Sequence, residues 1–183
     1  EMQNAYGGDQ HAVKQGLLDA RKGGVSGGHG VVAELIEVPE KLERASDMVL
    51  GGALQNIVVE RDEDAKRMIE YLRNNRFGRA TFLPIGSVRP RVLDAREREV
   101  LKLPGSLGVA SELLGFDEKY RGAVDNLLGR PVVAANLEAG LRIRRAGRYA
   151  FRLATPEGHV THSGGSLTGG RVQLPGQLVL SPV

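Results

Sequence analysis

Few side chains in this sequence could do acid–base, nucleophilic or metal chemistry. His159 and His162 form an H-x-x-H pair in a predicted turn. Two imidazoles are too few ligands for a metal site without a neighbouring carboxylate, so we interpret both as structural or solvent-facing. His11 is expected on an exposed helix and His29 in a glycine-rich linker. Neither is a candidate for catalysis.

Carboxylates, serines and thiols add no catalytic set. Asp62, Glu63 and Asp64 cluster, but helix capping explains them, because acidic groups favour the positive first turn of a helix. No plausible Ser-His-Asp set is visible. The sequence has no cysteine, which excludes disulfides, cysteine-ligated zinc and a thiol nucleophile. We therefore expect no catalytic residue, no metal and no cofactor.

The most informative stretch is 163–170, where two glycine pairs flank the residues Ser-Leu-Thr. Glycine has no Cβ, so it reaches positive φ and lets another main chain approach closely. No Lys-Ser/Thr follows Gly170, as a Walker A loop would require, and the pattern is not G-x-G-x-x-G after a first strand. A phosphate-binding nest of backbone N–H groups, a loop without function and a contact between protein chains remain. We favour the contact between chains.

Basic residues gather at two places. One run of arginines lies on a predicted helix and just after it: Arg142, Arg144, Arg145 and Arg148. A solvated helix face is the simplest interpretation of that run. Arg21, Lys22 and Arg171 lie at the two ends of the predicted folded part, and would form a small phosphate-binding patch if those ends met. The net charge of +3 and pI of about 9.4 permit nucleic-acid binding without requiring it.

The composition is that of a folded globular domain. Hydrophobic residues make up 41% of the 183 residues and charged residues 26%. No apolar run approaches the roughly 20 residues that span a bilayer, and no signal-peptide pattern opens the chain. We therefore expect a soluble, cytoplasmic protein. Aromatic residues make up 4%, with no Trp, which argues against an aromatic platform for stacking bases.

Short β-branched runs alternate with amphipathic helices, which predicts an α/β (mixed α+β) fold. Strands are expected at 31–38, 56–60, 80–85, 132–135 and 149–154, with a last short one before the glycine stretch. Helices are expected at 9–22, from Pro39 to the Gly51-Gly52 pair, from an Asp62 N-cap to Gly78, at 117–128, and at 137–145 after an Asn136 cap. Much of 86–116 and the final ten residues fit no element.

Six stretches together resemble one known family. They are HGVVAELIEV at 29–38, LGGALQNIVVE at 50–60, FGRATFLPI at 77–85, LGVASELLGFD at 107–117, LLGRPVVAANLEAG at 127–140 and GGSLTGG at 164–170. By their order and spacing, residues from about 10 to 172 resemble the hinge domain of structural maintenance of chromosomes (SMC) proteins, most like the bacterial SMC.

The resemblance implies an SMC hinge fold with two subdomains, assembled into a ring-shaped homodimer at the tip of long coiled coils. Residues 1–28 would be the incoming coiled-coil end and linker, 29–172 the hinge, and 173–183 a tail or the start of the outgoing coil. The implied dimer interface consists of Gly164, Gly165, Ser166, Leu167, Thr168, Gly169 and Gly170. The family's ATPase heads come from distant sequences, so this chain should not hydrolyse ATP.

The resemblance also implies a role in chromosome condensation and segregation. It implies that basic surfaces near the coil junction bind DNA, with a preference for single strands. Arg21, Lys22 and Arg171 are the candidates for this contact. The protein would be associated with the nucleoid and would meet accessory condensin-type subunits through other regions. Two alternatives are a nucleic-acid-binding module in its own right and a stand-alone α/β small-molecule or nucleotide-binding enzyme domain.

Overall fold

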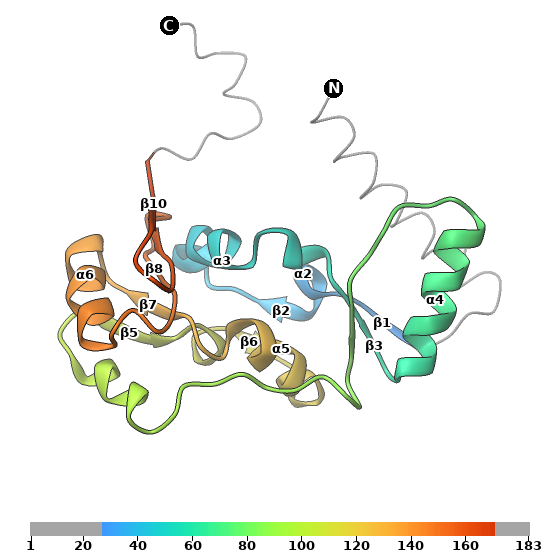
Figure 1. Cartoon of the computed structure of the whole chain (residues 1–183), viewed down its shortest axis with the longest axis horizontal. Coiled ribbons are helices and arrows are strands. Elements are labelled where there is room, and N and C mark those ends of the chain that lie inside the picture. Colours follow the sequence, from blue (N-terminus) through green and yellow to red (C-terminus); the bar gives the residue numbers. More distant parts are fainter. Residues whose placement is uncertain (1–26, 171–183) are drawn as a thin grey trace, which may run out of the picture. The chain divides into compact units, whose positions relative to one another are not determined.

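The computed structural model describes residues 27–170. These residues form two compact units, consistent with the two subdomains expected (Figure 1). Unit 1 consists of residues 27–37, Leu50–Val92 and Leu114–Gly129. Unit 2 consists of Val38–Val49, Leu93–Leu113 and residues 130–170. The helix expected at 9–22 and the tail at 173–183 lie outside the described residues.

A three-stranded sheet with the order β1-β3-β4 forms the centre of unit 1. Its strands are β1 (Gly28–Val31), β3 (Ile57–Val59) and β4 (Phe82–Pro84). β3 runs antiparallel to β1 and parallel to β4. All three β3 residues are buried, which explains their continuous Ile-Val-Val run. β4 is an edge strand, as Pro84 predicts.

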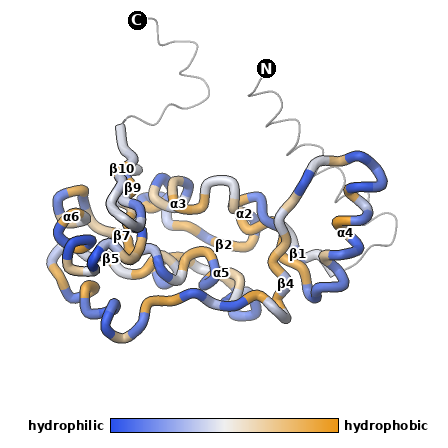
Figure 2. Tube along the Cα trace, viewed as in Figure 1, coloured by the Kyte–Doolittle hydropathy of each residue, from blue (hydrophilic) through white to orange (hydrophobic). Residues whose placement is uncertain are grey.

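Helix α4 (Asp62–Asn74) connects β3 to β4. Its buried residues Ala65, Met68 and Leu72 recur at helical spacing, and the tube in Figure 2 changes between hydrophilic and hydrophobic along it. The expected Asp62 N-cap is wrong. Arg61 is the N-cap, and the Asp64 carboxylate accepts the Arg61 backbone N–H at 3.0 Å, while the Asp62 carboxylate accepts the Ser87 hydroxyl.

The single strand expected at 31–38 is also wrong. β1 ends at Val31, a helical turn α2 (Val32–Leu35) follows, and β2 (Ile36–Glu37) pairs with β6 (Gly115–Phe116). Val32 and Ile36 are both buried, four residues apart, with Ala33 and Glu34 exposed between them. Burial therefore follows a helical period, which the β-branched side chains of this segment concealed.

Three further elements complete unit 1. They are η2 (Gly51–Gln55), η5 (Glu118–Tyr120) and α5 (Arg121–Leu128). Together η5 and α5 confirm the helix expected at 117–128.

A five-stranded sheet forms the centre of unit 2, in the order β10-β9-β8-β7-β5. Its strands, from one edge to the other, are β10 (Leu167–Thr168), β9 (Val160–Thr161), β8 (Leu153–Ala154), β7 (Val132–Ala134) and β5 (Ser106–Val109). The β7–β8 pair is parallel and the other pairs are antiparallel. α6 (Leu137–Ala146) lies between β7 and β8 in the chain and packs Ala139 and Ile143 into the core beside Phe151.

The helices of unit 2 agree more closely with those expected from the sequence. The Asn136 side chain accepts the Ala139 N–H at 2.8 Å and begins α6, as predicted. The helix after Pro39 appears as η1 (Glu40–Leu42) and α3 (Glu43–Leu50). Its expected stripe of Leu42, Ala45 and Val49 is buried. Residues 86–116, for much of which the sequence predicted no element, contribute η3 (Glu97–Lys102) and η4 (Ala110–Glu112) to this unit.

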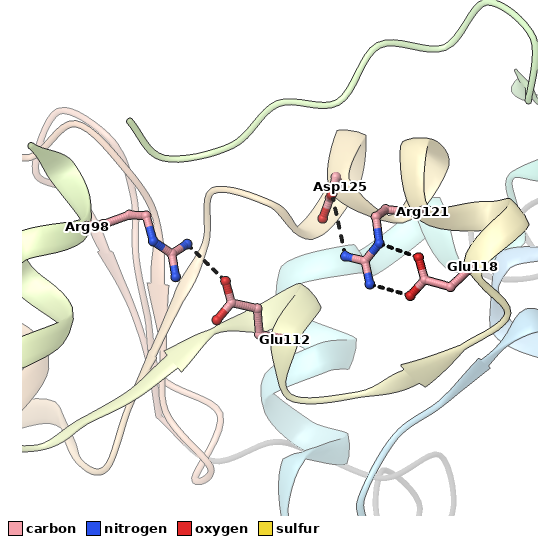
Figure 3. A network of polar contacts seen from close by, with 5 residues as sticks. All are labelled: Arg98, Glu112, Glu118, Arg121 and Asp125. Atoms are coloured by element: carbon pink, nitrogen blue, oxygen red, sulfur yellow. Dashed lines mark hydrogen bonds and ion pairs between the residues drawn. The ribbon is translucent and has the colours of Figure 1, made fainter. Parts of the chain in front are cut away.

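Several charged residues form ion pairs within their own unit, and Figure 3 shows those of Arg98 and Arg121. In unit 2, Arg98 pairs with Glu112 at 2.9 Å. In unit 1, Arg121 donates two hydrogen bonds to Glu118, at 2.7 and 2.6 Å, and lies 4.0 Å from the Asp125 carboxylate. Within residues 27–170 no helix is long and apolar enough to cross a membrane.

Candidate functional site

The predicted interface residues include turn residues and the second strand of a β-hairpin at the edge of the unit 2 sheet. We call residues 160–170, which contain β9, the turn and β10, the glycine hairpin (Figure 1). In β10, Leu167 pairs with Thr161 and Thr168 with Val160. Among residues 27–170, β9 is the one strand beside β10. An edge strand presents backbone N–H and C=O groups on its outer side, and here Leu167 is 53% exposed.

Backbone conformation explains three of the four glycines. Gly164, Gly165 and Gly170 have φ of 86°, 114° and 111°, values that residues other than glycine rarely adopt. Gly169 is needed for a close approach, because a Cβ there would lie 2.9 Å from Cδ2 of His159. A Cβ at Gly164 or Gly170 would meet nothing within 4 Å in the described part of the chain. The hairpin therefore leaves open space beside its main chain.

The two histidines of the H-x-x-H pair lie just before and within the glycine hairpin. His162 donates its backbone N–H to the Ser166 carbonyl at 2.8 Å, and its Nε2 lies 2.8 Å from the Thr168 hydroxyl. His159 contacts Thr155 through its backbone N–H and through Nδ1, at 3.2 and 3.3 Å. These contacts agree with a structural role. Residues 27–170 contain no group of three or more His, Asp or Glu side chains placed to hold a metal ion.

The turn of the glycine hairpin is bonded to the end of α6. The Gly164 N–H donates to the Tyr149 carbonyl at 3.0 Å, and Arg144 Nη1 donates to the Gly165 carbonyl at 2.8 Å. The Arg144 guanidinium also lies over the Tyr149 ring, with Cζ 5.1 Å from the ring centroid. Sequence reasoning placed Arg144 on a solvated face and missed this role, since no local pattern links it to Gly165.

The opposite edge of the sheet is less suited to pairing. β5 has an irregularity in its pairing with β7 between Ser106 and Gly108, and Gly108 has φ of 129°. Bulges of this kind twist an edge and interrupt its hydrogen-bonding row. β5 also exposes a leucine, Leu107, of which 42% is accessible. β10 is thus the more regular edge of this sheet.

The described residues include the predicted interface but none of the predicted DNA contacts. Residues 164–170 all lie in the glycine hairpin. Arg21, Lys22 and Arg171 lie outside the described residues.

Sequence comparisons place the chain among known proteins. The family model described as the SMC proteins flexible hinge domain matches residues 25–144. The Chromosome partition protein Smc of Desulfitobacterium hafniense (strain Y51) is 38% identical over 181 residues, which is 98% of this chain and 15% of the relative. The protein of the same name from Bacillus subtilis (strain 168) is 39% identical over 174 residues, which is 94% of this chain and 14% of the relative. The chain therefore spans only a small part of these relatives.

Solved structures agree. The SMC hinge domain of Geobacillus stearothermophilus, crystallised as an asymmetric dimer, is 41% identical, has a TM-score of 0.84, and is matched over 95% of this chain and 71% of that one. The Pyrococcus furiosus Smc hinge domain with an extended coiled coil is 27% identical, with a TM-score of 0.74 over 98% and 63% of the two chains. With a matching family model, relatives above 30% identity and a shared fold, this chain belongs to the SMC hinge domain family.

Proposed function

We propose that this chain is the dimerisation domain of a bacterial SMC protein, and that a second copy of the chain docks at β10. The observation that carries the proposal is the edge strand itself, with its exposed Leu167 and the open space beside Gly164 and Gly170. The dimeric hinge of Geobacillus stearothermophilus, 41% identical to this chain, supports it.

The proposed mechanism of assembly is strand addition. An incoming strand would satisfy the outer backbone groups of β10, and these directional hydrogen bonds would fix its register. The glycines let the second main chain come close without a side chain between. Burying the part of Leu167 that is still exposed, 53% of the residue, would add about 1 kcal/mol. The family resemblance further implies two separate contacts per dimer, so that one can open while the other holds the chains together.

Light scattering on the purified chain tests the proposal. At tens of micromolar we expect a dimer. Leu167→Glu should yield a folded monomer, because both chains carry the substitution and a charge is introduced wherever β10 pairs. Leu107→Glu is a matched control, since it alters an exposed leucine on the opposite edge of the same sheet, and it should remain a dimer. A monomeric wild type, or a Leu167→Glu variant with unchanged affinity, would contradict the proposal.

Replacing the glycines is a second test with a different interpretation. Bulkier residues at Gly164, Gly165, Gly169 and Gly170 should also give monomers. At three of these positions the replacement would strain a left-handed backbone. At Gly169 it would collide with His159. Circular dichroism must therefore show that the variants are folded before their association is compared.

In the longer protein, the hinge would join two chains that act in chromosome condensation and segregation at the nucleoid. It would contribute assembly rather than catalysis, and accessory subunits would bind elsewhere. DNA binding through Arg21, Lys22 and Arg171 belongs to the same proposal. It predicts a preference for single strands and an affinity that falls as salt rises, because phosphate contacts release counterions. Reversing the three charges should weaken the binding and lower its salt dependence; unchanged binding would place the DNA contact elsewhere.

A further inference from the structure

We propose that Arg144 and Tyr149 are positioning residues that hold the glycine hairpin in the shape that accepts a second copy. This inference rests on the proposed dimerisation at β10. It concerns two residues outside the 164–170 segment, which come from the end of α6 and the turn after it.

The two side chains and their main chains connect α6 to the hairpin turn at several points. Arg144 Nη1 donates to the Gly165 carbonyl at 2.8 Å, and the Tyr149 carbonyl accepts the Gly164 N–H at 3.0 Å. The Tyr149 N–H donates to the Arg144 carbonyl at 2.9 Å. The Arg144 guanidinium also lies over the Tyr149 ring. Arg144 therefore contacts both the hairpin turn and the residue that follows α6 and bonds to that turn.

The backbone of the junction is strained, which argues that its conformation matters. Arg148 and Tyr149 have φ of 56° and 59°, a left-handed region that is costly for side chains other than glycine or asparagine. Such conformations persist where surrounding contacts over-determine them, and they gather at functional sites. Here they accompany the hydrogen bond of the Tyr149 carbonyl to the hairpin turn.

The short hairpin gives these contacts a task. β10 has two residues and pairs with β9, and a two-residue ladder has few hydrogen bonds to keep it in place. Gly164 and Gly165 add flexibility next to it. A hairpin ordered in advance loses less conformational freedom when a second strand pairs with it, so the anchor would strengthen the dimer.

Neighbouring arginines provide matched controls. Arg142 is 56% exposed and its Nη1 lies 3.5 Å from Glu138, so Arg142→Ala removes a surface charge of the same helix. Arg145 shares the last turn of α6 with Arg144, so Arg145→Ala reproduces any loss of charge interaction with the helix dipole. An effect specific to Arg144 therefore reflects its bonds to Gly165 and Tyr149.

The experiment combines sedimentation velocity with hydrogen exchange of the Gly164 amide, using the full 183-residue chain. We expect Arg144→Ala to raise the dimer dissociation constant about tenfold, because without the anchor only a fraction of the monomers would hold the hairpin in the shape that pairs. It should also speed exchange at Gly164. Tyr149→Ala should act in the same direction, and Tyr149→Phe, which keeps the ring, should recover most of the lost affinity.

The possible results separate this inference from the proposed dimerisation. Arg144→Ala matching Arg145→Ala in both affinity and Gly164 exchange would overturn the inference. If Leu167→Glu is monomeric while Arg144→Ala keeps wild-type affinity, the inference fails and the proposed interface stands. A monomeric wild type would overturn both.

Discussion

At the scale of single residues, the ion pair between Glu97 and Arg130 is the one whose pH dependence the structure defines best. Arg130 donates to both carboxylate oxygens of Glu97, at 3.1 and 2.7 Å, and the Asp94 N–H donates to Oε1 at 3.0 Å. The hydrogen bond from Arg130, and then that from the Asp94 backbone, lower the pKa of Glu97. Only 18% of the Glu97 side chain is exposed, so solvent screens this pair incompletely.

Glu97→Gln should destabilise unit 2 near neutral pH. Because the folded-state pKa of Glu97 is lowered, its contribution is present above the unfolded value near 4.5 and is lost as pH falls through the folded value. We expect a loss of about 1–3 kcal/mol at pH 7, measured by urea unfolding, and a smaller difference from wild type at pH 3.

Glu118→Gln is the control for that prediction. Its carboxylate also accepts two hydrogen bonds from an arginine, Arg121, which lower the pKa of Glu118. Since its side chain is 74% exposed, solvent screening should leave a much smaller effect on stability. Equal losses for the two variants would show that burial does not determine the strength of the Glu97 pair.

At the scale of elements, the sequence predicted what local chemistry controls. Asn136 begins α6 because its side chain caps the helix, and β9 is the last short strand expected before the glycine stretch. The strand expected at 149–154 was shortened to β8, since Arg148 and Tyr149 adopt positive φ. That conformation accompanies bonds to Gly164 and Gly165, which are distant in sequence, so no local pattern could indicate it.

Asn136→Ala should weaken α6 by about 1 kcal/mol, because the Ala139 N–H would lose its acceptor. Urea unfolding followed by circular dichroism would measure it. Asn75→Ala is the comparison: that side chain donates to the Tyr71 carbonyl at the exposed end of α4, where water can replace it. A cost for Asn75→Ala as large as for Asn136→Ala would argue against the capping role.

An extended segment around Arg91 passes against the end of α5 in unit 1. The Arg91 N–H donates to the Asp125 carbonyl at 3.2 Å, and Asn126 donates to the Arg89 carbonyl at 2.9 Å. A Cβ at Gly129 would overlap the carbonyl oxygens of Arg91 and Asp125. Such a segment lacks helical or strand periodicity because its backbone bonds to a distant helix, which explains why its sequence was uninformative.

Gly129→Ala should therefore destabilise the chain by about 1–3 kcal/mol, since the Arg89–Val92 segment must move away from α5. Differential scanning calorimetry would detect the change as a lower melting temperature. Gly52→Ala is a suitable control, because within residues 27–170 a Cβ there meets nothing within 4 Å. If Gly129→Ala were as stable as Gly52→Ala, the close approach of the Arg91 carbonyl to Gly129 would be contradicted.

At the scale of the whole molecule, the two units are each built from three separated parts of the chain. Local periodicity cannot show such an arrangement, because it reports on neighbours in sequence. The order of six family motifs did indicate two subdomains, through resemblance to the SMC hinge, but not how the chain is divided between them. The remaining level is the assembly. For it we propose that a second copy of the chain pairs with the glycine hairpin.

Hydrogen exchange of residues 163–170, followed as a function of protein concentration, tests that claim most directly. If a second chain pairs with β10, amides of this segment should become protected in step with the dimer fraction found by light scattering. Amides of β5, at the opposite edge of the sheet, should not change. A dimer that forms while exchange at 163–170 stays constant would contradict the account.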